Sequence, residues 1–402
     1  MRKIILFFIF SEIAFSQIEK QVIIPPTGTK SILFLRIEFE DVKFSTDTSY
    51  FENLADKMNN YYKDMSYNTL FLTYTITSIL KSTRTMQCYG MHEKVYELKD
   101  DAISLAEENG ISLSGYDAIF ILHAGYGEET THDPKHIMSC HIIGTFSTVP
   151  ELGYPLGVWC HEFGHLLGLI DLYDVGTVGK WSLMAYGLFE EPPSPLDPYS
   201  RRLWIEGPQN VGNHLYLNPN IGHHIYKFGT MGEKCFLIEK RDCGFLVWYY
   251  EWSGGSLKKV SLLQADGRYD LENKRNYGDF GDPFPGETRN FLLDDYSVPS
   301  LKDFWGTETG FRIEILIPHA KKAKAFPNPI DLNKTKRVFF EVERGSSINI
   351  YNISGELVKS ISDHQNIGRI YWDIDNIARG VYIFVVLDKS GNRAYGKLGI
   401  IK

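Results

Sequence analysis

A short hydrophobic segment with three polar side chains constrains this chain more than any other feature. Val158–Leu167 has the sequence VWCHEFGHLL and is apolar on nearly every side except at His161, Glu162 and His165. Such a pattern predicts a buried helix. Polar groups in a buried helix need partners, because burying them unpaired costs free energy.

The spacing of the two histidines predicts a metal site. His161 and His165 are four residues apart, so their rings lie on one helix face and both can reach one ion at about 2.0 to 2.1 Å. Glu162 then lies beside the ion, where its carboxylate can take a proton from an attacking water and deliver it to a leaving amine. The bare His-Glu-x-x-His pattern also arises by chance, with histidines that neighbouring carboxylates satisfy.

A third ligand is expected just beyond the helix. Gly168 is expected to end the helix, because glycine adopts the left-handed conformation that turns the chain back. Asp171 follows His165 by six residues, the spacing of the extended zinc motif. Catalytic zinc keeps three protein ligands and one open position. Asp174 or a distant glutamate is the alternative ligand if Asp171 caps a turn instead.

The segment Lys180–Gly187 (KWSLMAYG) is expected to complete the site. A methionine turn packs under the metal in metzincin-type enzymes, so Met184 is expected to form an apolar floor, with an ordinary core methionine as the alternative. Tyr186 is expected to point its phenol into the cleft and to stabilise an oxyanion; a hydroxyl in solvent is the commoner arrangement. The strand ending at His123 and the loop Gly125–Glu129 are expected to border the cleft and to pair with an extended peptide.

Composition indicates a globular protein and excludes nucleic-acid binding. Hydrophobic residues make up 43% of the 402 residues and charged residues 23%, close to the soluble average. A net charge of −8 offers no basic surface for nucleic acid. The five cysteines are an odd set without the spacing of a zinc site, so free thiols or a pair between Cys235 and Cys243 are expected.

The N-terminus is typical of an exported protein. Arg2 and Lys3 precede the apolar run Ile4–Phe10, and small residues follow around Ala14, so residues 1–17 are predicted to be a signal peptide. A buried first strand is the alternative. The apolar run is far shorter than the ~20 residues that span a bilayer, so no transmembrane segment is expected.

The remaining pattern predicts an α+β protein of three parts. A mixed sheet with helices is expected over residues 30–208 as the zincin-like, metzincin-like catalytic domain, a β-rich domain over 209–320, and an Ig-like β-sandwich over 325–402. The predicted strands include 31–38, 70–77, 116–123, 235–239, 245–251, 337–342, 347–351, 370–373 and 380–387, and the predicted helices 50–65 and 96–109. His132, His136 and His141 are expected in a surface loop rather than at a second metal site.

The chain resembles the immune inhibitor A family of secreted bacterial zinc peptidases, whose hallmark is a helix like HEFGHLLGLIDLYD, here His161–Asp174. Similar segments spread over most of residues 30–317: Phe34–Phe44, Tyr61–Leu70, Ile121–Glu129, Lys180–Gly187 and parts of Leu262–Gly286. The resemblance implies extracellular hydrolysis of proteins with one Zn²⁺, held by His161, His165 and Asp171, with Glu162 as the catalytic residue. Ile170 stands where the family commonly has proline, and the pro-segment usual in the family is not evident.

The same resemblance allows a structural Ca²⁺. The acidic segment with Asp266, Asp270, Asp279 and Asp282 offers hard oxygen ligands, but it lacks the regular spacing of an EF-hand loop. Solvated turn residues are the alternative.

The C-terminal part resembles sorting or flagellar-hook-cap β-sandwich modules in Ala325–Ile330, Ile348–Val358 and Ala378–Val386. This implies export and attachment to the cell surface or to secretion machinery. Two other functions compete with a peptidase: a non-catalytic surface adhesin with a structural zinc site, and zinc-dependent hydrolysis of a non-peptide amide or ester. Glu162 speaks against the adhesin, because a structural zinc site fills its fourth position with a protein ligand.

Overall fold

The structure is a computed structural model, and its described residues form two compact units. They are residues 22–90, 94–204, 209–210, 213–217, 225–231, 233–254, 256–286, 288–303, 306–315, 323–364, 367–374, 377–389, 391 and 393–401. One unit comprises residues 1–215 and 223–313, and the other comprises 216–222 and 314–402. The predicted signal peptide, residues 1–17, lies outside the described residues. The predicted domains 30–208, 209–320 and 325–402 stay predictions.

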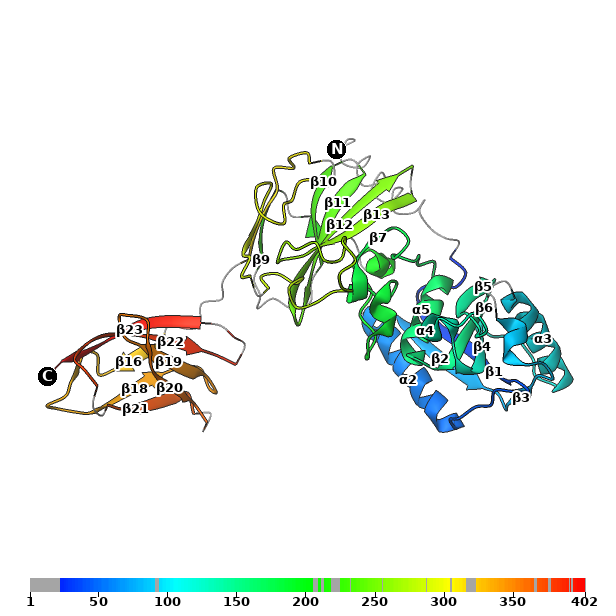
Figure 1. Ribbon diagram of the computed structural model, residues 1–402, viewed down its shortest axis with the longest axis horizontal. Coiled ribbons are helices and arrows are strands. Elements are labelled where there is room, and N and C mark those ends of the chain that lie inside the picture. Colours follow the sequence, from blue (N-terminus) through cyan, green and yellow to red (C-terminus); the bar gives the residue numbers. More distant parts are fainter. Residues whose placement is uncertain are drawn as a thin grey trace. The chain divides into compact units, whose positions relative to one another are not determined.

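The first part of the chain is a mixed sheet between helices. The strand order is β2 (Leu70–Ile76), β1 (Gly28–Glu38), β4 (Ala118–Tyr126), β6 (Phe146–Leu152) and β5 (Cys140–Ile143), with β3 (Leu80–Lys81) also paired to β1. All of these pairs are parallel except that of β5 with β6. Helices α2 (Thr48–Met65) and α5 (Pro155–Leu166) lie on one side of the sheet and α3 (Val95–Glu108) on the other (Figure 1). A short helix, α4 (Glu128–Thr131), follows β4.

Strand β1 shows why this sheet is central. Ile32 and Phe34 belong to the hydrophobic core shared with α2 and α5, and Leu33 and Leu35 belong to the core shared with α3. Side chains alternate between faces along a strand, so a run without polar residues is buried on both. The α+β class and the main strands and helices predicted for this part are confirmed; β4 runs to Tyr126, three residues beyond its predicted end.

The second half of this unit is mostly β-structure. Its main sheet has the order β7 (Gly176–Thr177), β13 (Ser256–Leu263), β12 (Gly244–Ser253), β11 (Lys234–Arg241), β10 (Ile225–Met231) and β8 (Gln209–Asn210). The short strands β9 (His214–Leu217), β14 (Leu292–Leu293) and β15 (Arg312–Ile315) are also present, and the last two residues of β9 and of β15 fall in the other unit. Because β7 follows the predicted metal helix and pairs with β13, the β-rich sheet is joined to the loop that carries Asp171.

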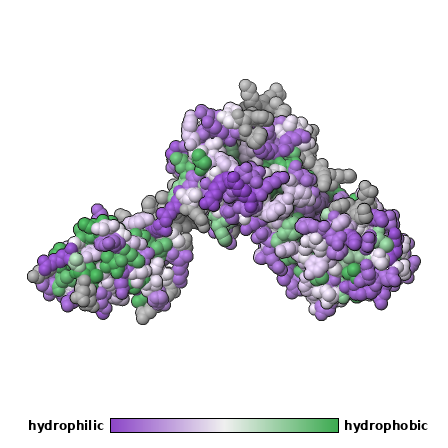
Figure 2. Space-filling model, viewed as in Figure 1, coloured by the Kyte–Doolittle hydropathy of each residue, from purple (hydrophilic) through white to green (hydrophobic). Residues whose placement is uncertain are grey.

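The C-terminal unit consists of two sheets over one core. The strand order of the smaller sheet is β16 (Lys324–Phe326), β18 (Arg337–Glu341) and β21 (Arg369–Asp373). The strand order of the larger sheet is β17 (Ile330–Asp331), β23 (Arg393–Ile401), β22 (Gly380–Leu387), β19 (Ser347–Tyr351) and β20 (Leu357–Ser362). Buried residues of both sheets, such as Phe340 and Phe384, form the core. Hydrophobic residues also gather on the visible surface of this unit (Figure 2). Val381 of β22 and Tyr395 of β23 are 50% and 64% exposed.

Two further observations bear on the sequence predictions. All five cysteines are free, so the pair considered between Cys235 and Cys243 is not formed; Cys235 is buried in β11 and Cys243 is exposed in the turn that follows. No helix within the described ranges is long and apolar enough to cross a membrane.

Candidate metal centre

The helix that carries the two histidines, α5 (Pro155–Leu166), begins three residues before the predicted Val158 and ends at the turn predicted at Gly168. Pro155 occupies the first turn of α5, where its missing N–H is not needed. At the other end Gly168 has a φ of +86°, its N–H donates to the His165 carbonyl, and the Leu169 N–H donates to Gly164. These two bonds form a Schellman motif, which turns the chain back toward the helix. The turn brings Asp171 to the histidines.

Two glycines let the methionine turn approach this helix. A β-carbon at Gly164 would lie 2.8 Å from the Met184 sulfur, and one at Gly157 would lie 1.8 Å from the Leu188 carbonyl oxygen. Any larger residue would push the turn away, so we expect both positions to require glycine. Met184 is fully buried and packs against the helix at Gly164, the residue before His165, as expected for an apolar floor under the site.

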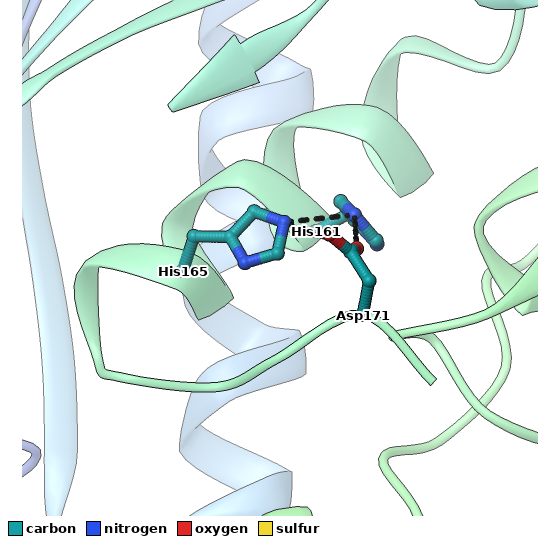
Figure 3. A group of neighbouring side chains, drawn as sticks. All are labelled: His161, His165 and Asp171. Atoms are coloured by element: carbon teal, nitrogen blue, oxygen red, sulfur yellow. Dashed lines mark hydrogen bonds and ion pairs between the residues drawn. The ribbon is translucent and has the colours of Figure 1, made fainter. Parts of the chain in front are cut away.

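The backbone fixes the tautomers of both histidines. His161 Nδ1–H donates to the Leu183 carbonyl at 3.0 Å, and His165 Nδ1–H donates to the Leu169 carbonyl at 2.9 Å. Because a carbonyl only accepts, each Nδ1 must carry a proton, which leaves Nε2 of the neutral ring with a free lone pair. The two Nε2 atoms face one another at 3.1 Å (Figure 3).

Asp171 completes a triangle of donor atoms. Its Oδ1 lies 3.0 Å from His161 Nε2 and 3.2 Å from His165 Nε2. Burial raises the pKa of this carboxyl, but the two imidazoles, when they are protonated, outweigh burial and hold that pKa far below its usual range. A tetrahedral ion with ligands at 2.0 to 2.1 Å separates those ligands by about 3.3 Å. These three side chains therefore fit one small cation. Among the described residues, no other group of three or more histidine, cysteine, aspartate or glutamate side chains lies close enough together to hold a metal ion.

Glu162 lies beside this triangle and is itself buried. Its side chain is 4% exposed, and its Oε2 has no hydrogen-bond partner. Burial raises the pKa of Glu162, while the nearby His161 and His165 lower it. A buried carboxylate with an unpaired oxygen is placed to accept a proton and to return it.

The other predicted residues are distributed as follows. Asp174 is exposed and is not part of the triangle. Tyr186 is 39% exposed, and its ring lies 6.2 Å from the ring of Tyr173, which in turn is 6.3 Å from that of His161. Tyr173 is not among the residues predicted from the sequence, although its position two residues after Asp171 is a signal that it lies near the candidate metal site.

The prediction that an extended peptide pairs with the strand ending at His123, which is part of β4, is wrong. β4 is paired to β1 on one side and to β6 on the other, so it offers no free edge to a peptide. The outer strand on this side of the sheet is the antiparallel β5, and its Cys140 lies near enough to Glu162 for that carboxylate to raise the cysteine pKa further, beyond the larger effect of burial.

A second buried carboxylate, Asp197, holds the methionine turn from behind. It is fully buried and accepts hydrogen bonds from Ser182 Oγ (3.0 Å), Ser200 Oγ (2.6 Å), the N–H groups of Tyr199 and Ser200, and the Tyr250 hydroxyl (2.9 Å). Tyr250 belongs to β12, so this carboxylate links the turn to the β-rich sheet.

The same turn presents the carbonyl that orients His161. Ser182 Oγ accepts from the Met184 N–H at 3.2 Å, and Leu183 between them supplies the carbonyl that fixes the His161 tautomer. Asp197 is thus a positioning residue for His161, and no sequence pattern marked it, because its partners are far apart in the chain.

Asp197→Asn is expected to weaken both the fold and metal binding. Without the negative charge the surrounding donors lose strong hydrogen bonds, so the free energy of unfolding should fall by about 2 to 4 kcal/mol. Metal affinity should fall by roughly 10- to 100-fold, as for other groups that orient ligands. Urea unfolding and competition with a chelator measure the two effects. Tyr250→Phe, which removes one donor, should cost about 1 kcal/mol; unchanged metal affinity in Asp197→Asn would contradict the positioning role.

Comparison with known proteins identifies two segments. Residues 102–192 match the catalytic domain of the immune inhibitor A peptidase M6 family, and residues 324–401 match a secretion-system C-terminal sorting domain. No curated protein matches the chain.

Solved structures show only weak likeness. Wild-type OgpA from Akkermansia muciniphila is 11% identical over 93% of each chain, with a TM-score of 0.32. CopC from Methylosinus trichosporium is 24% identical over 21% of this chain and 94% of its own, with a TM-score of 0.17. TM-scores this low do not establish a shared fold.

The region matched by the peptidase family contains His161, Glu162, His165 and Asp171, and the sorting domain covers nearly the whole C-terminal unit. The chain therefore carries a segment of the immune inhibitor A peptidase M6 catalytic domain, which supports a metallopeptidase, and a C-terminal sorting domain, which indicates secretion.

Proposed function

We propose that this protein is a zinc-dependent endopeptidase of zincin type, with His161, His165 and Asp171 as ligands and Glu162 as general base. The observation that carries the proposal is the convergence of two unprotonated Nε2 atoms and one carboxylate oxygen, at 3.0 to 3.2 Å, beside an unpaired buried carboxylate. Three lone pairs this close repel one another unless a cation lies among them. Two imidazoles and one carboxylate are a donor set that zinc accepts.

Zinc, when bound, polarises the carbonyl of the substrate and makes water a better nucleophile. The chain's own part is to hold and move protons: Glu162 Oε2 is free to take the proton of the attacking water and to give it to the departing amine. Tyr186 is the proposed donor to the oxyanion, and its exposed ring leaves its hydroxyl accessible to substrate. The antiparallel edge strand β5 is the proposed support for an extended peptide.

The adhesin alternative gains no support. A structural zinc site needs no fourth group that can move a proton, whereas Glu162 is buried at a cost and has one oxygen unpaired. The sorting domain, which we propose to be an Ig-like sandwich, gives the chain its route to the cell surface and its contact with secretion machinery.

Hydrolysis of labelled casein by the full chain tests the proposed function. We expect cleavage that stops with 1,10-phenanthroline and returns when zinc is added back. Zinc-loaded protein that binds about one ion and cleaves neither casein nor synthetic peptides would contradict the peptidase proposal.

The acidic segment of the β-rich part provides a pH-dependent prediction. Asp282 is 2% exposed, and burial, with smaller effects of Asp279 and Asp266, raises its pKa from 3.8 to about 6. Between these values the folded chain binds more protons than the unfolded one, so the free energy of unfolding falls as pH rises through this window. We expect Asp282→Asn to melt at a higher temperature than wild type at pH 7.5 but not at pH 4.

Calcium is proposed only as a structural ligand of this segment and is tested by the same pair of proteins. If Asp282 binds calcium, millimolar calcium should raise the melting temperature of wild type at pH 7.5 and leave that of Asp282→Asn unchanged. An equal response of both proteins would exclude Asp282 as a calcium ligand.

A further inference from the structure

Three exposed tyrosines form a row that starts at the metal centre. Tyr173 lies beside His161, with ring centres 6.3 Å apart and an angle of 9° between the planes. Tyr186 follows at 6.2 Å from Tyr173, and Tyr277 at 4.4 Å from Tyr186. Their exposed fractions are 42%, 39% and 62%. The row is built from three segments: the loop after Asp171, the methionine turn and a loop of the β-rich part.

The loop that supplies Tyr277 is fixed through its backbone. The Lys180 N–H donates to the Tyr277 carbonyl at 2.6 Å, and Gly179, with a φ of +53°, passes so close that a β-carbon there would lie 2.2 Å from that oxygen. Trp181 Nε1–H also donates to Asp282 at 2.7 Å across the same contact. The Tyr277 side chain is therefore not needed to hold the loop in place, although the loop holds Tyr277 against Tyr186.

Aromatic surface of this kind is costly to leave in water, and clusters of it mark binding sites. Neighbouring rings of the row are tilted by 49° and 46°, so a flat ring can pack on them in the offset or edge-on geometry that aromatic pairs prefer.

We propose that Tyr173, Tyr186 and Tyr277 form a substrate subsite that binds an aromatic side chain close to the scissile bond. This inference rests on the proposed peptidase function and names its specificity. An extended peptide advances about 3.3 Å per residue and places every second side chain on one side. Ring-to-ring steps of 6.3, 6.2 and 4.4 Å lead from His161 along the row, so the row can contact side chains that lie within a few residues of the bond cleaved at the metal.

Mapping of cleavage sites tests the subsite. Casein digested by the full wild-type chain is expected to show Phe, Tyr or Trp enriched at one position on one side of the cleaved bonds. Two quenched peptides that differ only by Phe or Ala at that position then give a ratio of kcat/KM. We expect a preference for Phe of about tenfold in wild type, a fall of that ratio to about twofold in Tyr277→Ala, and a wild-type ratio in Tyr277→Phe, which keeps the ring.

Tyr296→Ala is the matched control, because Tyr296 is also exposed (78%) but has no ring contact with the row; it should keep the wild-type ratio. An unchanged ratio in Tyr277→Ala, or a wild-type preference for Lys or Arg, would overturn the subsite while the peptidase function stands. Failure of zinc-loaded wild type to cleave either peptide would overturn both.

Discussion

Glu162→Gln is expected to lower kcat for casein and peptide hydrolysis by roughly 10²- to 10⁴-fold while the protein keeps its metal. Glutamine preserves the shape of the side chain but cannot act as a base. The metal should stay bound, because Glu162 supplies none of the three donor atoms of the triangle. Because the Glu162 carboxylate is buried with one oxygen unpaired, its neutral replacement should not destabilise the fold. Steady-state kinetics and zinc content by mass spectrometry are measured on the same sample.

A matched control separates proton transfer from a general effect of charge. Glu129 is partly buried near Glu162, but its carboxylate is already bound to the N–H and hydroxyl of Ser139. Glu129→Gln should therefore retain most of the activity that Glu162→Gln loses. Equal losses in the two variants, or loss of zinc in Glu162→Gln, would contradict the assignment of Glu162 as general base.

Asp171→Asn is expected to abolish activity through loss of the metal. The carboxylate oxygen lies within 3.2 Å of both imidazole nitrogens and supplies the negative charge of the site, so the amide should bind zinc far more weakly. The drop in affinity should exceed the roughly 10- to 100-fold effect expected for a residue that only orients a ligand. Competition with a fluorescent chelator measures the affinity.

Asp174→Asn provides the control for this variant, because Asp174 lies three residues away and is exposed. It should bind zinc as wild type does. Zinc should also raise the melting temperature of wild type and of Asp174→Asn, and not that of Asp171→Asn, because a ligand that binds only the folded chain stabilises it. Undiminished zinc binding by Asp171→Asn would show that another residue is the third ligand.

Local patterns were sufficient to predict the helix and the positions of its polar residues. The apolar run around His161 and His165 predicted a buried helix, and Gly168 predicted its end, because each signal depends on a few adjacent residues. The resemblance to the immune inhibitor A family and to a C-terminal sorting module is confirmed by the segments that match.

Features built from distant segments were not predictable from the sequence. Asp197 has no motif of its own, and its importance depends on Tyr250, 53 residues away in β12. Tyr277 joins Tyr186 only because a β-rich loop is bonded to Lys180. The edge position of β5 depends on strand order, which the local alternation of side chains does not specify.

The metal centre itself is tested most directly by a crystal structure of zinc-loaded wild-type protein with anomalous diffraction recorded on both sides of the zinc absorption edge. We predict one strong anomalous peak about 2.0 to 2.2 Å from His161 Nε2, His165 Nε2 and an Asp171 carboxylate oxygen. A zinc peak bound by other side chains, with these three atoms left without metal, would contradict it.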